Sequence, residues 1–339
     1  MTGAAAAIPD VGGRSPAPAR WPDETLSEAL AAAAATVVRE QLPTGELPTY
    51  VRGGDGRLEY RRSPLLSSFV HDALAVFDPA SEWMERELLD LLTPAVRRRL
   101  FPVAARMRRK LRAFLAWDEE AHGTWRLLGR GSGIGPDADV TACAACAVLQ
   151  ARAHGGELRW RRHVASLERL RRDADDEGVA EAANVVRFLA LIGEDVEDDA
   201  ERLLDRIAAG GLDEDSHRYT GWIARLYCAT RAWGQGALPG RDELRATTLP
   251  GLLDRQEDDG SFGGPLDTAL GLLCLVELDR PGPAASRAMA ALAASRRAVA
   301  GGWPYQAAFT HGGGSCALST TLAMAALARA AVDAAEGTA

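Results

Sequence analysis

Lysine is almost missing from this sequence, and acidic residues outnumber basic ones. Lys110 is the only lysine among 39 basic residues, and 47 acidic residues give a formal net charge of −8. Neutralising nucleic-acid phosphates requires a basic face, so this balance excludes a general nucleic-acid-binding protein. Of the 339 residues, 47% are apolar and 25% are charged, which is the ordinary composition of a soluble globular protein.

Cysteines and long apolar runs are also few. Five cysteines, an odd number, form no disulfide-rich pattern and indicate a reducing, cytoplasmic setting. Cys143 and Cys146 form a CxxC, but neither a second CxxC nor a nearby histidine pair completes a zinc site. No run approaches the ~20 apolar residues that cross a bilayer, so we expect no membrane span.

The N-terminal segment lacks the basic start and the continuous apolar core of a secretory signal. It is rich in Ala, Gly and Pro, so we expect residues 1–25 to form a disordered leader. Residues 26–335 then form a single domain.

Strand signals are scarce, and helical patterns of two kinds fill the stretches between Gly/Pro breaks. Residues 157–172 and 284–297 interleave arginine with apolar residues, as helices with one solvent-exposed face do. Residues 141–149, 268–278 and 320–331 are small and apolar almost all round, which predicts burial on every side. The alternation of the two kinds predicts an inner ring of helices with an outer ring packed around it.

Similar inner-helix starts recur along the chain, and their number predicts the size of the ring. Six starts predict six helix hairpins, and so an all-α (α/α)6 barrel with six inner and six outer helices. These starts lie near residues 67–70, 139–142, 184–186, 222–227, 267–269 and 319–322.

Three loops that precede inner helices share one design, at residues 117–125, 256–262 and 301–305. Glycine allows a sharp turn, and the aromatic residue that follows can pack over a helix end. Together these loops resemble the Gln…Gly-x-Trp/Phe repeats of the terpenoid-cyclase and protein-prenyltransferase toroid superfamily. The resemblance covers roughly residues 44–332 and implies the toroid with six inner and six outer helices.

The segment Asp137-Ala-Asp139-Val-Thr-Ala142 resembles the Asp-x-Asp-Asp-Thr-Ala element of class II terpene cyclases. The middle aspartate of that element protonates the substrate, so the resemblance implies that Asp139 is the general acid and that Asp137 modulates it. Val140 departs from the pattern, because it stands where the third aspartate belongs. Oxidosqualene cyclases have cysteine at this place, and some short bacterial drimenyl-diphosphate-type cyclases have threonine.

Protonation of an alkene requires a neutral carboxylic acid, although an unperturbed aspartate has a pKa of about 3.9. Burial disfavours the carboxylate, and Asp139 precedes a small, apolar helix. Asp137, two residues earlier, would add like-charge repulsion. The alternative is structural: Asp139 caps its helix, and Asp137 assists the helix dipole.

A carbocation needs aromatic faces and the exclusion of water. If the substrate is a diphosphate, Arg126 and Arg130 flank the Asp139 loop and would neutralise it. His311 precedes the last inner helix, where it would bond the acid or touch the substrate. The candidate aromatic residues for the chamber are Phe69, Trp125, Trp222, Tyr227, Trp303, Tyr305 and Phe309.

The resemblance implies a class II terpene cyclase, an isomerase or intramolecular lyase of terpenoid biosynthesis. Its substrate would be a linear isoprenoid such as farnesyl or geranylgeranyl diphosphate. Mg²⁺ would accompany a diphosphate, although no motif demands a metal. The chain has room for one helical domain, so the chamber is either its own lumen or is completed by a second copy in a homodimer.

Two other functions remain open at this point. The toroid can bind an isoprenoid or a protein without catalysis. Alternatively, it is a glycoside-active α/α barrel, in which paired carboxylates lie about 6.5 to 9.5 Å apart. The glycoside hypothesis requires Asp139 to face a second acid across an open, polar groove.

Overall fold

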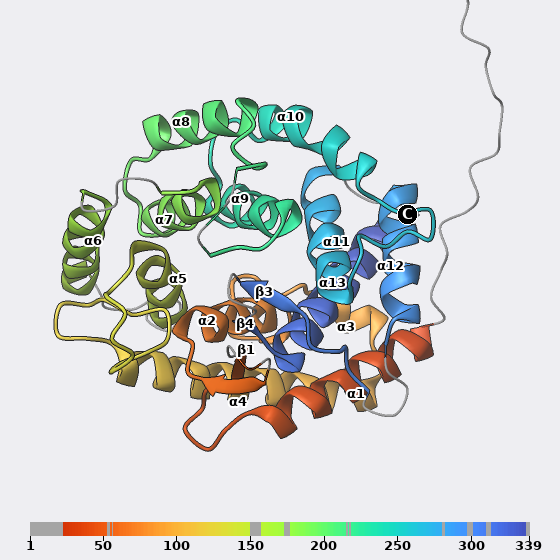
Figure 1. Cartoon of the computed structure of the whole chain (residues 1–339). Coiled ribbons are helices and arrows are strands. Elements are labelled where there is room, and N and C mark those ends of the chain that lie inside the picture. Colours follow the sequence, from red (N-terminus) through yellow and green to blue (C-terminus); the bar gives the residue numbers. More distant parts are fainter. Residues whose placement is uncertain are drawn as a thin grey trace, which may run out of the picture.

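The computed structural model describes residues 23–52, 55, 57–149, 157–172, 177–214, 216, 218–279, 282–296, 301–309 and 313–336. Figure 1 looks roughly along the axis of a barrel made of two concentric layers of helices. The expected leader, residues 1–25, falls almost wholly outside the described residues, since the first helix begins at Asp23.

Six helices of the described chain form a closed inner ring. Each contacts the next, and the last contacts the first, so the ring has no open edge (Figure 1). The inner helices are α2 (Pro64–Ala73), α5 (Ala138–Leu149), α7 (Val179–Leu191), α9 (Trp222–Gly236), α11 (Pro265–Asp279) and α13 (Cys316–Glu336).

Six further helices of the described residues form the outer layer, and each packs against one or two inner helices. They are α1 (Asp23–Glu40), α4 (Pro94–Asp118), α6 (Glu157–Arg172), α8 (Glu197–Ala208), α10 (Arg241–Asp254) and α12 (Pro283–Ala294). Outer and inner helices alternate along the chain, with the 3₁₀ helix η1 (Leu74–Phe77) and the short α3 (Leu88–Leu91) inserted after α2. The predicted all-α (α/α)6 toroid is confirmed.

The two layers differ in burial as the two sequence patterns predict. All twelve residues of α5 are buried, because α2, α4, α6 and α7 surround it. In the outer helix α8 only Ala200, Leu203, Leu204 and Ile207 are buried, at the spacing of one helical face.

Helix α13 is apolar because it belongs to the inner ring. Among the described residues, it is the one helix whose length and composition would allow it to cross a membrane. However, 78% of its apolar window is buried inside the protein, against α1, α2, α11 and α12. We expected no such run from the sequence, and the burial accounts for the one that is found.

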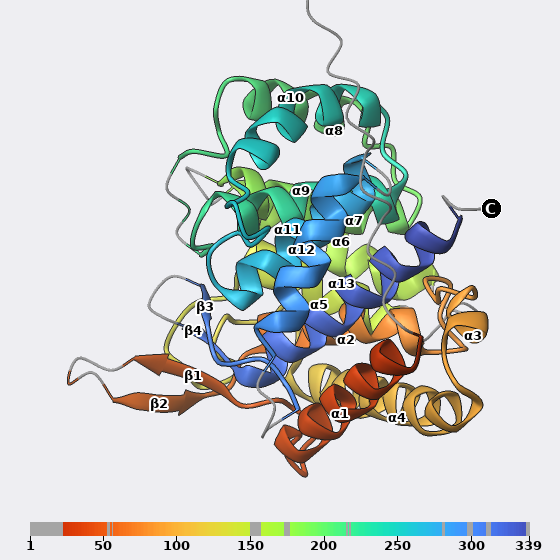
Figure 2. The same ribbon diagram turned by 90° about the vertical axis from the view of Figure 1, so that its right-hand side faces the viewer.

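A small antiparallel sheet lies at the end of the barrel where the inner helices begin (Figure 2). Its strand order is β2-β1-β4-β3, formed by β1 (Thr49–Arg52), β2 (Leu58–Arg61), β3 (Ala307–Phe309) and β4 (Gly313–Gly314). Strand β3 reaches the loop before α9, where the Thr220 N–H donates to the Ala308 carbonyl at 3.3 Å. The sheet therefore covers part of the barrel mouth.

Two tryptophans of the predicted repeats join outer helices to inner ones. Nε1 of Trp125 donates to the Leu115 carbonyl of α4 at 2.8 Å, and its backbone N–H donates to Thr141 Oγ1 of α5 at 3.1 Å. Trp303 makes the same two bonds, at 2.8 and 3.0 Å, to a carbonyl of α12 and a threonine hydroxyl of α13. Both side chains are buried and hold the two layers together.

A glutamine completes the same turn in two of the repeats. Nε2 of Gln256 bridges the Gly260 carbonyl at 3.0 Å and a carbonyl at the start of α12 at 2.9 Å. Gln41 makes the equivalent bridge to the Gly45 carbonyl at 2.9 Å and to a carbonyl of α4 at 3.3 Å. The loop that contains Gln41 is a repeat that we did not identify in the sequence.

Candidate active site

Asp137 is the N-cap of α5. Its Oδ1 accepts the Val140 N–H at 2.9 Å, which satisfies a donor that the first turn of the helix leaves free. Its Oδ2 pairs with Arg218, from the loop before α9. The negative charge of Asp137 is therefore matched locally. Since Asp137 takes the capping position, Asp139 is not the cap.

Asp139 is the second residue of α5 and points into the barrel, with 1% of its surface exposed. Tyr219 donates its hydroxyl to Oδ2 at 2.8 Å, and Asn184 of α7 donates Nδ2 to Oδ1 at 2.7 Å. The thiol of Cys143, one turn along α5, lies 3.8 Å from Oδ1. The closed surroundings exclude the open, polar groove that a glycoside-active site requires.

Burial, assisted by the nearby Glu181 carboxylate, raises the pKa of Asp139 to about 8. The hydrogen bonds from Tyr219 and Asn184 and the charge of Arg231 oppose this shift. The carboxyl group consequently keeps its proton at neutral pH, while two donors are already placed to stabilise its anion. The like charge that we expected from Asp137 comes instead from Glu181.

Arg231 of α9 links Asp139 to a buried ion cluster. Its Nη2 donates to Asn184 Oδ1 at 2.5 Å, and because a guanidinium only donates, this bond turns the Asn184 amide nitrogen toward Asp139. Nη1 of Arg231 lies 3.5 Å from Asp72 Oδ2, which Arg187 of α7 also contacts, at 2.7 Å. Two buried cations therefore share the Asp72 carboxylate in the barrel lumen.

The guanidinium of Arg231 lies over two aromatic rings of the predicted chamber. It is 4.2 Å from the centroid of Phe69 and 5.6 Å from that of Tyr227. Phe69 also packs against Tyr219, with centroids 6.1 Å apart. A cavity of only about 30 Å³ remains beside Arg231 and Tyr227. Phe69 and Tyr227 thus form a cation-binding surface next to the acid, and Arg231 occupies it.

Asp139 has no hydrogen bond from the other predicted chamber residues whose side chains the structure describes, Trp125, Trp222, Trp303 and Tyr305. Trp125 and Trp303 support the turns described above, and Trp222 packs under Arg255 with 4.2 Å between the guanidinium carbon and the ring centroid. Tyr305 is half-buried in the segment before β3. The side chain of Phe309 and the whole of His311 lie outside the described residues.

The two predicted diphosphate ligands differ in their surroundings. Arg126 is engaged, because its Nε pairs with Glu120 at 2.5 Å and its Nη1 donates to the Ile134 carbonyl at 2.8 Å. Arg130 is exposed on the loop before α5, and its backbone N–H donates to Asp118 Oδ1 at 3.3 Å. Among the described residues, no group of three His, Cys, Asp or Glu side chains could hold a metal ion.

Three residues at the site were missed by sequence reasoning: Tyr219, Asn184 and Arg231. Asn184 lies where the sequence predicted an inner helix to begin, although α7 (Val179–Leu191) begins five residues earlier. A buried amide in an apolar helix is a usable signal. Arg231 interrupts the apolar helix α9 in the same way. Tyr219 comes from a loop, and no local pattern marks it.

No protein-family model and no curated protein matches the chain. Solved structures do. The type II terpene cyclase MstE from Scytonema aligns with a TM-score of 0.60 at 14% identity, over 92% of this chain and 99% of that one. A variant of that enzyme in complex with geranylgeranyl dihydroxybenzoate, its substrate, aligns with a TM-score of 0.59 at 15% identity, over 93% of this chain and 98% of that one.

A larger protein shares the same architecture. The ent-copalyl diphosphate synthase from Streptomyces platensis aligns with a TM-score of 0.55 at 18% identity, over 79% of this chain and 50% of that one. At such low identities the likeness concerns the fold. The chain is a toroid with the fold of the class II terpene cyclases.

Proposed function

We propose that this protein is a class II, protonation-initiated terpene cyclase with Asp139 as its general acid. The observation that carries the proposal is a fully buried carboxyl group that accepts hydrogen bonds from two donors and whose pKa is raised by burial to about 8. Desolvation keeps the proton in place, and Tyr219 and Asn184 stabilise the anion that its loss creates. The similar fold of a class II terpene cyclase supports the role of Asp139 as general acid.

The reaction begins with transfer of the Asp139 proton to a substrate alkene. The alkene π electrons form the new C–H bond, and the neighbouring carbon becomes cationic. A second alkene of the same chain attacks that carbon and closes a ring. A carbon next to the final cation then loses a proton to solvent, and the C–H electrons form a new C=C bond, so that the overall change is an isomerisation. Asp139 is then reprotonated from solvent.

Phe69 and Tyr227 offer the faces that would stabilise the carbocation. In the structure, the Arg231 guanidinium holds this position and leaves little free volume. An entering prenyl chain therefore has to displace Arg231. Asp139 is buried inside the closed ring of inner helices, so we place the chamber in the lumen of one barrel.

The substrate class is a linear isoprenoid, with farnesyl and geranylgeranyl diphosphate as first candidates. Of the two predicted diphosphate ligands, Arg130 is the exposed one, whereas Arg126 is engaged with Glu120. Mg²⁺ would accompany a diphosphate as part of the substrate. The Scytonema neighbour binds geranylgeranyl dihydroxybenzoate, so a prenylated aromatic acid is a third candidate.

The test is product formation by the purified protein and by Asp139→Asn. Each is incubated with the two diphosphates, with geranylgeranyl dihydroxybenzoate and with epoxidised analogues, and cyclic products are identified by mass spectrometry. We expect a cyclic isomer from the wild type and a loss of at least ~10²–10⁴-fold in Asp139→Asn, the usual contribution of a general acid.

Asp137→Asn is the matched control for this experiment. Asparagine caps a helix as well as aspartate does, so this variant should keep most of the activity. Equal product from the wild type and Asp139→Asn would remove Asp139 from the mechanism.

A non-catalytic isoprenoid-binding toroid is the second candidate. The ion cluster of Arg231, Asp72 and Arg187 favours it, because these side chains fill the lumen that a cyclase must open. This function predicts that prenyl substrates bind without turnover and that Asp139→Asn binds them as the wild type does.

A further inference from the structure

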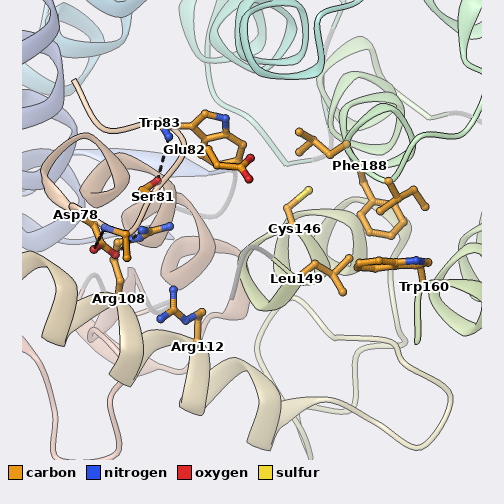
Figure 3. Close-up of a pocket in the computed structure, with 13 residues that line it drawn as sticks. Asp78, Ser81, Glu82, Trp83, Arg108, Arg112, Cys146, Leu149, Trp160 and Phe188 are labelled. Atoms are coloured by element: carbon orange, nitrogen blue, oxygen red, sulfur yellow. Dashed lines mark hydrogen bonds and ion pairs between the residues drawn. The ribbon is translucent and has the colours of Figure 1, made fainter. Parts of the chain in front are cut away.

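A second cavity lies at the other end of the barrel, away from Asp139. It has a volume of about 310 Å³ and opens between α4, α5, α6 and α7 (Figure 3). Cys146 and Leu149, from the last turn of α5, line it. Asp139 and Cys146 are separated by roughly 10 Å along the helix axis. Its volume is at the lower end of the range for small-molecule sites, about 300–1,000 Å³.

The walls of the cavity are chemically divided. Leu149, Phe188 and Trp160 form an apolar wall from three helices (Figure 3). The facing wall carries Arg108 and Arg112 of α4. A site of this kind suits a molecule that is apolar at one end and charged at the other.

Arg112 is the cation of this wall for which the described residues form no direct ion pair. Arg108 pairs with Asp78 at 2.6 Å, whereas Arg112 makes no hydrogen bond or ion pair with any residue that the structure describes (Figure 3). Burial lowers the pKa of Arg112 and the charge of Arg108 lowers it further, while the charge of Asp78, which is bonded to Arg108, opposes this shift. The remaining carboxylate of the lining, Glu82, is exposed. An anion in the cavity would supply the missing charge.

A second guanidinium near this cavity also has unused donors. Arg187 is fully buried, and its Nε and Nη1 have no partner among the described residues. Its guanidinium carbon lies 5.4 Å from the ring centroid of Trp83, which lines the cavity. Buried donors without partners are rare in native proteins, and an unfilled ligand site is one explanation for them.

We propose that this cavity binds a small amphipathic anion, whose carboxylate or phosphate pairs with Arg112 and whose apolar body lies between Leu149, Phe188 and Trp160. A guanidinium matches both head groups, because its planar fork donates two parallel hydrogen bonds. The site is distinct from the acid, because Arg187, Asp72 and Arg231 lie between them in the lumen. It does not depend on the cyclase activity of Asp139.

The experiment measures binding to the full-length protein by isothermal titration calorimetry, with octanoate, octyl phosphate and octanol as probes. The two anions distinguish a carboxylate from a phosphate ligand, and octanol retains the chain without the charge. We expect at least one anion to bind roughly 10- to 100-fold more tightly than octanol, as a charged hydrogen bond predicts.

Arg112→Gln should remove this preference and leave octanol binding unchanged. Arg109→Gln is the matched control, because Arg109 is exposed on the same helix and does not line the cavity. Asp139→Asn should bind the anions as the wild type does, which separates this site from the proposed active site.

Three results would overturn the proposal. The first is equal affinity of the wild type for octanol and for both anions, and the second is no binding of either anion at millimolar concentration. The third is an Arg112→Gln protein that retains the anion preference. If Arg112→Gln does not fold, a crystal structure of the wild type with the bound anion decides, since an anion away from Arg112 would equally contradict the assignment.

Discussion

At the scale of single residues, the site depends on opposing influences on one carboxyl group. Desolvation and Glu181 hold the proton on Asp139, while Tyr219 and Asn184 stabilise its loss. A group that is only desolvated would be a weak acid, and one that is only hydrogen-bonded would be ionised before the substrate arrives. The combination gives an acid that is neutral before the reaction and whose anion is stabilised by hydrogen bonds already in place.

Removing the titration of Asp139 should change how stability depends on pH. The folded chain holds this proton up to about pH 8, whereas the unfolded chain releases it near 3.8. The free energy of unfolding of the wild type therefore falls as pH rises across this window, by on the order of a few kcal/mol. Asp139→Asn has no such penalty. The difference between its melting temperature and that of the wild type should therefore shift in favour of the variant as the pH is raised from 5 to 8. A constant difference across that range would contradict the raised pKa.

Tyr219→Phe should weaken the acid without removing it. The variant loses one hydrogen bond to the anion, so we expect kcat to fall by about 10- to 100-fold. The pKa of Asp139 should rise further, which moves the alkaline fall of kcat/KM from about pH 8 to higher pH. Tyr227→Phe keeps an aromatic face and has no bond to Asp139, so its pH profile should match that of the wild type. A shared profile for all three proteins would exclude Tyr219 from this role.

At the scale of elements, the repeated turns fix each outer helix to the inner helix that follows. The tryptophan or phenylalanine N–H bonds a threonine hydroxyl in the inner helix in three of these turns. The aromatic residues expected in the chamber at Trp125 and Trp303 are used in this way. A Gly-x-Trp/Phe repeat therefore predicts architecture better than it predicts substrate contacts.

Gly260→Ala should destabilise the fold more than Gly263→Ala. Both glycines have positive φ, 88° and 93°, so alanine at either costs roughly 1–2 kcal/mol of backbone strain. A Cβ at Gly260 would lie 2.6 Å from the backbone carbonyl of Arg287, whereas one at Gly263 meets nothing within 4 Å. The clash adds about 1–3 kcal/mol. Urea unfolding measures both, and equal losses would show that the turn is not tightly packed against α12.

At the scale of the whole molecule, the toroid creates a lumen, and charged side chains fill it. Arg187 and Arg231 contact the same oxygen of Asp72 from two different helices. Only a closed ring brings these residues together, because they lie 115 and 159 positions from Asp72 in the chain. Opening the lumen to a prenyl chain requires this cluster to rearrange.

Arg231→Met should increase the affinity for farnesol, an uncharged prenyl probe. The change vacates the face of Phe69 and leaves Asp72 paired with Arg187. Since the chain no longer displaces a charge-bonded guanidinium, we expect a gain of roughly 10- to 100-fold in a binding titration. Arg187→Met is the control, because Arg187 does not cover Phe69. Unchanged affinity in Arg231→Met would place the prenyl chain outside the lumen.

The sequence by itself determined the ring of twelve helices and the helix that carries the acid. Burial periodicity and the repeated turns each depend on residues that are close together in the sequence, so both can be recognised from a single stretch of chain. The same holds for Asp137 and Asp139, although their roles as cap and buried acid were separated only by the structure. Phe69 and Tyr227 were also anticipated as neighbours of the site, and they lie together under Arg231.

Only the tertiary structure decided what surrounds Asp139. Asn184 and Tyr219 reach it from 45 and 80 residues away, and Glu181 replaces Asp137 as the like charge. These partners are determined by how six helices close into a ring, and no local sequence pattern predicts contacts between residues so far apart in the chain. The filled lumen and the Arg112 cavity have the same origin, because burial and charge pairing depend on every helix that packs around a point.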